Sequence, residues 1–152
     1  MSFIGRKEEL KSLAELKKKD SASLVCVLGR RRIGKSAIIQ EFGKSAKNYF
    51  EIQGLGPKDD TDKLPTTAEQ LMHVAKEISA RFKVPQQNFN DWDDAFEFLS
   101  KCVAKGEWVV LLDEISWLGG SDKLFPMKLK SAWDVKFKRN SKLILVLCGS
   151  VS

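Results

Sequence analysis

The chain has 152 residues, of which 43% are apolar and 30% are charged, and its formal net charge is +6. This composition is typical of one soluble globular domain, and a chain of this length forms a core without disulfides or a structural metal. No apolar run approaches the roughly 18–20 residues that a membrane-spanning helix needs, and the N-terminus lacks the apolar segment of a signal peptide. We therefore expect a cytoplasmic protein with no membrane partner.

The charge is distributed unevenly along the chain. Residues 1–50 carry 12 basic and 5 acidic side chains, residues 51–100 carry 5 and 10, and residues 101–152 carry 9 and 5. An excess of this size can attract nucleic acid or an acidic partner, but it is also common among proteins that bind only phosphate groups. Charge alone leaves both interpretations open.

The three cysteines are Cys26, Cys102 and Cys148, and they form no CxxC pair. Two of them lie in strongly apolar runs, where a free thiol behaves as a small buried hydrophobic group. We expect three buried thiols and neither a metal site nor a redox pair.

The elements predicted in chain order alternate between helices and short apolar strands. The predicted helices cover residues 7–19, 35–42, 66 or 67 to 82, 91–106 and 124–138, and the predicted strands cover 24–28, 49–52, 108–112 and 143–148. Three of the strands show no polar alternation, which indicates a parallel sheet buried on both faces. Strands that alternate with helices imply right-handed βαβ units, so the predicted fold class is α/β, a three-layer αβα sandwich. Residues 54–65, rich in Gly, Pro and Asp, form a surface loop.

The segment Gly29-Arg-Arg-Arg-Ile-Gly-Lys-Ser36 matches the phosphate-loop pattern GxxxxGK[ST] at every fixed position, directly after an apolar strand and at the start of a helix. Glycines let successive backbone N–H groups point at phosphate oxygens, and the helix N-terminus adds its positive dipole end. Lys35 would reach the β- and γ-phosphates, and the Ser36 hydroxyl would ligate Mg²⁺. The candidate nucleotide-binding residues of this segment are Gly29, Arg30, Arg31, Arg32, Ile33, Gly34, Lys35, Ser36 and Ala37.

The three arginines Arg30, Arg31 and Arg32 occupy variable positions of this loop. They could touch phosphates, a neighbouring subunit or nucleic acid, or remain solvated. No aromatic residues alternate with them to stack on bases, so solvent exposure or a protein contact is the favoured interpretation over nucleic-acid binding.

A second candidate site follows the apolar strand 108–112, where Asp113 and Glu114 stand side by side. Ligands of open parallel sheets bind at the carboxyl ends of the strands. Asp113 would hold Mg²⁺, and Glu114 would orient and polarise the attacking water. ATPases that use an activated water usually have this glutamate, whereas P-loop kinases and GTPases usually lack it. Trp117 is expected in the loop that follows.

The last strand ends in Gly149-Ser-Val-Ser152. In sheets of this type, the strand between the phosphate-loop strand and the Asp-Glu strand often ends in a small polar residue that contacts the γ-phosphate. Ser150 is the first candidate for this role and Ser152 is the second. An ordinary polar start of a loop explains the same residues equally well.

Together these motifs resemble the archaeal-type ATPases, within the signal-transduction branch of AAA+-like P-loop ATPases. The opening Phe3-Ile-Gly-Arg-Lys-Glu-Glu-Leu10 is similar to the hydrophobic-hydrophobic-Gly-Arg-x-x-Glu-Leu box of that branch. The triple arginine before a β-branched residue and Gly-Lys is similar to the family's phosphate loop. Leu112-Asp-Glu114 with Trp117, the later Trp133-Asp134, and 143–150 match in order and spacing.

The resemblance implies a parallel sheet of order 5-1-4-3-2 and an adenine site formed partly by Phe3, Ile4, Gly5 and Arg6. Lys7 stands where the family often has Glu. The family's pattern continues past residue 152 with a fifth strand, a helical lid and an effector region, so residues 1–152 are expected to be an ATPase core that is incomplete at its C-terminus. Arg139 is a weak candidate for an arginine finger.

The sequence therefore predicts an ATP-binding and Mg²⁺-dependent ATP-hydrolysing core, with Lys35 and Glu114 as its catalytic residues and Ser36 and Asp113 as its metal ligands. One alternative is a nucleotide-binding regulator that does not turn over on its own. Another is a basic nucleic-acid-binding module. A homo-oligomer is left open.

Overall fold

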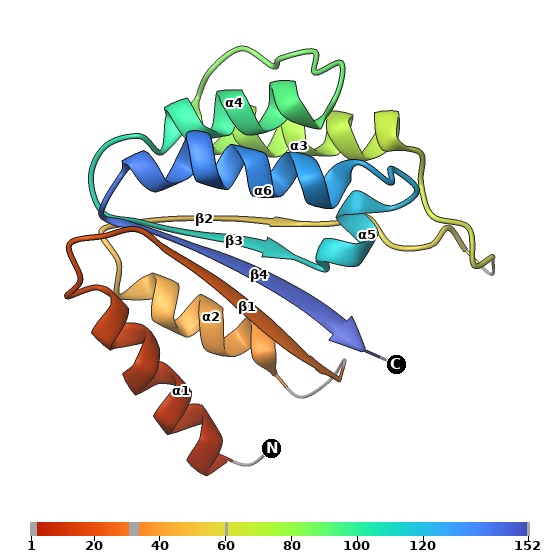
Figure 1. Ribbon diagram of the computed structural model, residues 1–152. Coiled ribbons are helices and arrows are strands. Elements are labelled where there is room, and N and C mark those ends of the chain that lie inside the picture. Colours follow the sequence, from red (N-terminus) through yellow and green to blue (C-terminus); the bar gives the residue numbers. More distant parts are fainter. Residues whose placement is uncertain (1–2, 31–33, 60, 152) are drawn as a thin grey trace.

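The computed structural model describes residues 3–30, 34–59 and 61–151, without the side chains of residues 3–9, 30 and 151. Figure 1 shows three layers, with a sheet between two groups of helices. The elements in chain order are α1 (Phe3–Leu16), β1 (Ser23–Arg30), α2 (Lys35–Lys44), β2 (Asn48–Gln53), α3 (Thr67–Phe82), α4 (Trp92–Cys102), β3 (Trp108–Asp113), α5 (Ile115–Gly119), α6 (Phe125–Val135), the 3₁₀ turn η1 (Phe137–Arg139) and β4 (Leu143–Val151).

The sheet has the order β1-β4-β3-β2, and all of its neighbouring strands are parallel. This is the predicted order 5-1-4-3-2 without its fifth strand, and the predicted α/β class is confirmed. The register pairs Gly29 with Ser150 and Gln53 with Asp113. The carboxyl ends of the strands therefore meet at one edge of the sheet, where the predicted functional residues lie.

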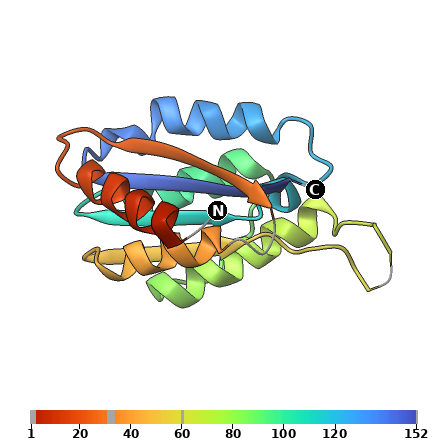
Figure 2. The ribbon, with the colours of Figure 1, turned by 90° about the horizontal axis from the view of Figure 1, so that it is seen from below.

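Helices cover the two faces of the sheet separately. α1 and α2 lie on one face, and α3, α4 and α6 lie on the other (Figures 1 and 2). All six residues of β3 are buried, because it is an inner strand covered from both sides. Two hydrophobic clusters result, one between the sheet and α1/α2 and a larger one that contains the aromatic side chains of α4 and α6.

The helix boundaries follow local capping chemistry. The Thr66 side chain accepts from Glu69 N, and the Glu69 side chain accepts from Thr66 N, which is the capping box that starts α3. Asp91 Oδ1 accepts from Asp94 N at 2.9 Å and starts α4, as predicted. Within the described ranges, no helix is both long enough and apolar enough to cross a lipid bilayer.

Four helical segments differ most from the sequence prediction, and the strands and α2 are each one to three residues longer than predicted. α1 begins at Phe3 and ends at Leu16, rather than covering 7–19. α4 ends at Cys102, because the chain leaves the helical conformation at Val103, before Gly106. The predicted helix 124–138 is divided into α6 and η1. The segment after Glu114, expected to be a loop, forms α5, whose five residues are too few to show a helical pattern in the sequence.

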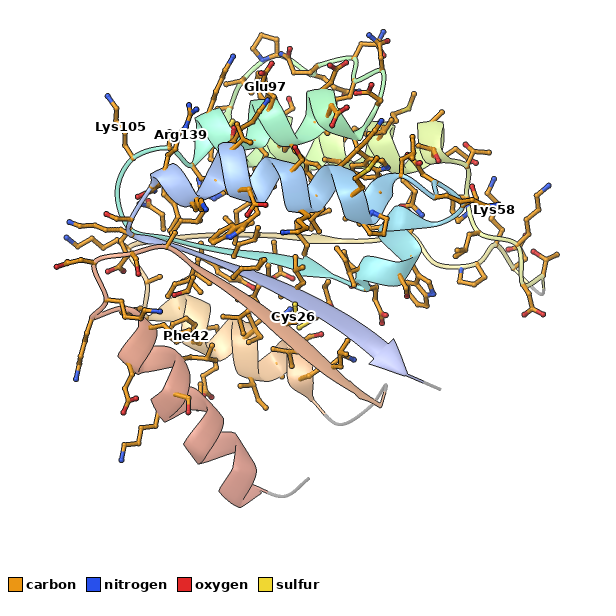
Figure 3. The ribbon with its side chains drawn as sticks, viewed as in Figure 1. Cys26, Phe42, Lys58, Glu97, Lys105 and Arg139 are labelled. Atoms are coloured by element: carbon orange, nitrogen blue, oxygen red, sulfur yellow. The ribbon has the colours of Figure 1, made fainter. Side chains whose placement is uncertain are left out.

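The expectation of three buried cysteines is wrong for Cys26, which is exposed, whereas Cys148 is buried and Cys102 is intermediate. The reason is that the larger hydrophobic cluster takes its described strand residues from β2, β3 and β4 and none from β1, so this face of β1 is left uncovered. Leu24 and Leu28, on the same face of β1 as Cys26, are 39% and 68% exposed. Figure 3 labels Cys26 on this strand. Burial raises the pKa of the Cys148 thiol to about 12.

The segment between β2 and α3 projects beyond the carboxyl edge of the sheet (Figures 1 and 2). Lys58, labelled in Figure 3, lies on this segment, and its Nζ is 2.8 Å from Glu69 Oε2. The hydrogen bond from Lys58, followed by the one from Thr66 N, lowers the pKa of Glu69 to about 2. The predicted surface loop is therefore anchored at its tip to the first turn of α3.

Candidate functional site

The phosphate-loop segment connects the carboxyl end of β1 to α2. Gly34 has φ 77° and ψ 21°, a left-handed conformation that favours glycine. α2 begins at the next residue without a side-chain cap and without an acidic residue in its first turn. Its first N–H groups and its positive dipole end therefore lie at the carboxyl edge of the sheet, where an anion can bind.

Lys35 and Ser36 occupy the first turn of α2. Lys35 is only 6% exposed, and its Nζ donates a hydrogen bond of 2.9 Å to Ser150 Oγ at the end of β4. Ser36 Oγ donates to Asp113 Oδ2 at 2.7 Å. α2 thus brings an ammonium group and a hydroxyl group to the ends of two neighbouring strands.

Ser150 links the lysine to the glutamate of the predicted site. Its hydroxyl accepts from Lys35 and donates to Glu114 Oε1 at 3.2 Å. Lys35, Asp113 and Glu114 are all less than 10% exposed. The cation and the two carboxylates are therefore held in a poorly hydrated site, where electrostatic interactions are stronger than in water.

Glu114 has an unusual backbone conformation, with φ 51° and ψ 55°. For a residue other than glycine, such a conformation costs about 1–3 kcal/mol and persists only where its surroundings impose it. Asp113 Oδ1 accepts from Glu114 N at 2.9 Å, and Glu114 O accepts from Trp117 N and Leu118 N at 3.0 Å each. The chain turns sharply here, so that two adjacent carboxylates from one strand reach the same site.

The donor set fits Mg²⁺. The Ser36 hydroxyl and the Asp113 carboxylate converge within hydrogen-bond distance, and both are hard oxygen ligands of the kind that Mg²⁺ takes from proteins, with phosphates and water for the remainder. In the part of the chain that the structure describes, no group of three or more His, Cys, Asp and Glu side chains could hold a metal ion by itself. A metal at this position would take its remaining ligands from water or from the phosphate groups of a bound nucleotide.

A polar cluster between α2 and β2 lies on the same face of the sheet as Asp113. Gln40 Nε2 donates to both carboxylate oxygens of Glu51, and Tyr49 Oη donates to Glu51 Oε1 at 3.2 Å. Burial, followed by the neighbouring Glu51, raises the pKa of the Tyr49 hydroxyl well above its usual range. The phenol therefore stays a neutral donor, and the cluster fixes α2 against β2.

The structure brings together the predicted residues Lys35, Ser36, Asp113, Glu114 and Ser150, with Gly29, Gly34 and Ala37 beside them in the chain. Arg31, Arg32, Ile33 and Ser152 lie outside the described residues, as does the side chain of Arg30. Phe3, Ile4, Gly5 and Arg6 are placed in the first turns of α1 without described side chains, so their contact with adenine stays a prediction. Arg139 lies in η1, before β4, at the opposite end of the sheet from the phosphate loop (Figure 3).

Two residues near Glu114 were missed in the sequence. Gln70 of α3 is 1% exposed and bonds to the backbone of Trp117 in α5, and Gly54 lies under the first turn of α5. The pattern that could have identified Gln70 is its position four residues before Val74 and next to Leu71, on the inward face of α3. A polar residue at such a position requires hydrogen-bond partners.

Glu114 lies inside the site, bonded to the same serine that bonds the phosphate-loop lysine, and its role toward water stays a prediction. The parallel αβα sheet, with the phosphate-loop segment leading into α2 at its carboxyl edge, is the fold of a P-loop ATPase core. The chain belongs to the family described as an ATPase domain predominantly from Archaea, whose sequence model matches residues 3–152.

Two proteins of Methanocaldococcus jannaschii are similar in sequence. The uncharacterized protein MJECL04 is 25% identical over 150 residues, which are 99% of this chain and 30% of that protein. The uncharacterized ATP-binding protein MJ0423 is 40% identical over 45 residues, which are 30% of this chain and 76% of that protein. The chain thus spans less than a third of the length of MJECL04.

Two solved structures share the fold. The Walker-type ATPase Paby2304 of Pyrococcus abyssi superposes with a TM-score of 0.63 at 22% identity, covering 95% of this chain and 44% of that one. A chain of the Drosophila ORC structure, which is bound to DNA, superposes with a TM-score of 0.55 at 20% identity, covering 96% and 38%. At these identities, the likeness concerns the fold.

Proposed function

We propose that this chain binds ATP with Mg²⁺ at the carboxyl edge of its sheet and hydrolyses the bond between the β- and γ-phosphates. The observation that carries the proposal is the hydrogen-bonded series from Lys35 through Ser150 to Glu114, next to the pair Ser36–Asp113. One ammonium group, one hydroxyl–carboxylate pair of the kind that Mg²⁺ binds, and one further carboxylate lie around the start of α2. In-line attack on a γ-phosphate requires these three functions.

Each residue has a separate role in this proposal. Lys35 attracts the β- and γ-phosphate oxygens as a point charge, and the backbone N–H groups at the start of α2 bind the same oxygens. Ser36 and Asp113 hold Mg²⁺, which when bound neutralises phosphate charge. Glu114 accepts a hydrogen bond from the attacking water and orients it, and Ser150 contacts a γ-phosphate oxygen. Catalysis rests on positioning and charge, with no covalent intermediate.

The test separates binding from turnover. In Lys35→Ala, nucleotide binding measured by calorimetry should be lost. Glu114→Gln should bind ATP with Mg²⁺ but release phosphate about a hundredfold or more slowly, the scale of a lost general base. Glu97→Gln is the matched control, because Glu97 is an exposed carboxylate that pairs with Lys136 rather than with the site. Equal turnover by Glu114→Gln and the unaltered protein would contradict the role of Glu114.

A non-hydrolysing regulator predicts a different result. In that case, ATP at about 100 times its Kd would stabilise the fold by about 2.7 kcal/mol without release of phosphate. The position of Glu114 favours hydrolysis, because a regulator that only binds needs no buried carboxylate beside the γ-phosphate site.

We also propose that this core works as an AAA+-like regulatory unit of a larger protein, with a lid and an effector region beyond residues 1–152. The partial coverage of MJECL04 and Paby2304 supports the part of this proposal that concerns a longer protein. The measurement is a comparison of residues 1–152 with a longer form of the protein for ATP hydrolysis and self-association. Equal rates of hydrolysis and the same oligomeric state for the two forms would contradict it.

A further inference from the structure

The side chain of Gln70 connects three segments of the chain. Its Oε1 accepts from Leu55 N at 2.9 Å, and its Nε2 donates to Leu55 O at 2.9 Å and to Trp117 O at 3.1 Å. One amide therefore pairs with the backbone of Leu55 as a strand would, and it also binds the backbone of α5. Gln70 is 1% exposed, so water cannot replace these bonds.

Gly54, which directly precedes Leu55, holds the same segment close to α5. Its N–H donates to Asp113 O at 2.9 Å, which extends the pairing of β2 with β3 by one residue. A Cβ added at Gly54 would lie 2.6 Å from Leu118 N and 2.8 Å from Glu114 O, closer than real Cβ atoms approach backbone atoms. Only glycine lets the chain after β2 pass this close to the first turn of α5.

The contacts of Gln70 and Gly54 both reach the turn that begins at Glu114, whose backbone is in the left-handed conformation. The amides of Trp117 and Leu118 bond to Glu114 O, and Gln70 holds Trp117 O. We propose that Gln70 and Gly54 are positioning residues for Glu114. They hold the first turn of α5 against the segment that follows β2, and thereby keep the Glu114 carboxylate directed at Ser150 and the phosphate site.

This inference rests on the proposed role of Glu114 in hydrolysis and deepens it. Neither residue lies among the nucleotide contacts or the metal ligands, so neither should alter nucleotide affinity. The first variant is Gln70→Met, which keeps the length of the side chain and removes its three hydrogen bonds. The second is Gly54→Ala, which displaces the same turn by a different route.

The matched control is Asn140→Leu. Asn140 is also an amide that bonds two backbone carbonyls, with Nδ2 at 2.8 Å from Val103 O and 2.9 Å from Gly106 O. It lies before β4, at the opposite end of the sheet from Glu114. The control therefore reports the general cost of losing a structural amide.

The expected result is a separation of kcat from binding. In Gln70→Met and Gly54→Ala, kcat should fall about tenfold or more, whereas the Kd for ATP should change by less than about threefold. Asn140→Leu should lower stability without lowering kcat. In the Glu114→Gln background, Gln70→Met should cause no further loss of kcat, because the effect of Gln70 passes through the Glu114 carboxylate. The inference would be overturned if Gln70→Met lowered kcat by the same factor in the unaltered protein and in the Glu114→Gln background. It would also be overturned if kcat were unchanged in both Gln70→Met and Gly54→Ala.

A second measurement does not depend on turnover. Hydrogen exchange of the Trp117 and Leu118 amides should become at least about tenfold faster in Gln70→Met, and should stay unchanged in Asn140→Leu. Unchanged exchange at these two amides in Gln70→Met overturns the inference, even if the protein binds ATP without hydrolysing it. Absence of hydrolysis together with faster exchange refutes the proposed function alone.

Discussion

Replacing Ser150 by alanine tests how the site is held together before nucleotide arrives. The substitution removes the hydroxyl that accepts from Lys35 Nζ at 2.9 Å and donates to Glu114 Oε1 at 3.2 Å. Both partners are ionisable and less than 10% exposed, so water replaces the lost bonds poorly. A hydrogen bond to a charged group contributes about 1.5–3 kcal/mol. Because two such bonds are lost, we expect the free energy of unfolding without nucleotide to fall by at least this amount.

The effect on nucleotide binding should have the opposite sign. Phosphate oxygens can take the place of Ser150 as acceptors for Lys35, so the ADP complex loses less than the free protein. Each 1.4 kcal/mol of this difference tightens binding about tenfold. ADP should therefore bind Ser150→Ala more tightly than it binds the unaltered protein, while for ATP the loss of the proposed contact with the γ-phosphate should offset the gain.

The assay combines urea unfolding of the free protein with calorimetric titration of ADP. Ser45→Ala is the control, since Ser45 Oγ likewise accepts from a lysine, Lys17, at 2.9 Å, but in an exposed position. Its cost should stay within about 0.5 kcal/mol, as for most surface substitutions. If Ser150→Ala shows both the unfolding free energy and the ADP affinity of the unaltered protein, the bridging role of Ser150 is refuted.

Three further outcomes are expected. Thr66→Ala removes the acceptor of the capping box and should lower the unfolding free energy by about 1 kcal/mol; no change in urea unfolding would contradict the role of the cap. Because the pKa of Glu69 in the folded protein is lowered to about 2, the stability that the Glu69 carboxylate contributes is present above its unfolded pKa and is lost as pH falls toward 2. The difference in unfolding free energy between the unaltered protein and Glu69→Gln should therefore shrink over that pH range. A difference that stays constant would contradict this expectation. A maleimide should modify exposed Cys26 in the native protein and Cys148 only after unfolding, since thiol chemistry requires an accessible thiolate; mass spectrometry that finds Cys148 labelled first would disprove the assigned burial.

The sequence predicted the parts of the molecule that have a repeating pattern. The apolar runs 108–112 and 143–148 became the inner strands β3 and β4, and the periodic apolar residues of 66–82 became the inward face of α3. The spacing of the phosphate-loop motif from Asp113 and Glu114 indicated a shared site, and the bond from Ser36 to Asp113 agrees with that expectation.

The remaining features depend on contacts that carry no local pattern. The run 24–28 resembles an inner strand, yet β1 lies at an edge of the described sheet and contributes no described residue to the larger hydrophobic cluster, so the exposure of Cys26 depends on which strands the helices cover. The conformation of Glu114 is imposed by Asp113 and by the first turn of α5 rather than by a glycine. Gln70 binds backbone atoms of Leu55 and Trp117, which any residue supplies, so no pairwise signal marks the contact.

The alternation of side chains along β4 has a consequence for correct folding. Leu143 and Leu145 face one hydrophobic cluster, Ile144 and Val146 face the other, and Ser150 lies on the second face. A shift of β4 by one residue would exchange the two faces. Because both sets are large aliphatic side chains, the apolar residues discriminate weakly against such a shift, yet Ser150 would then point away from Lys35 and Glu114. Nucleotide binding therefore reports the correct strand register more sharply than burial does, and a misregistered chain can be compact, well packed and inactive.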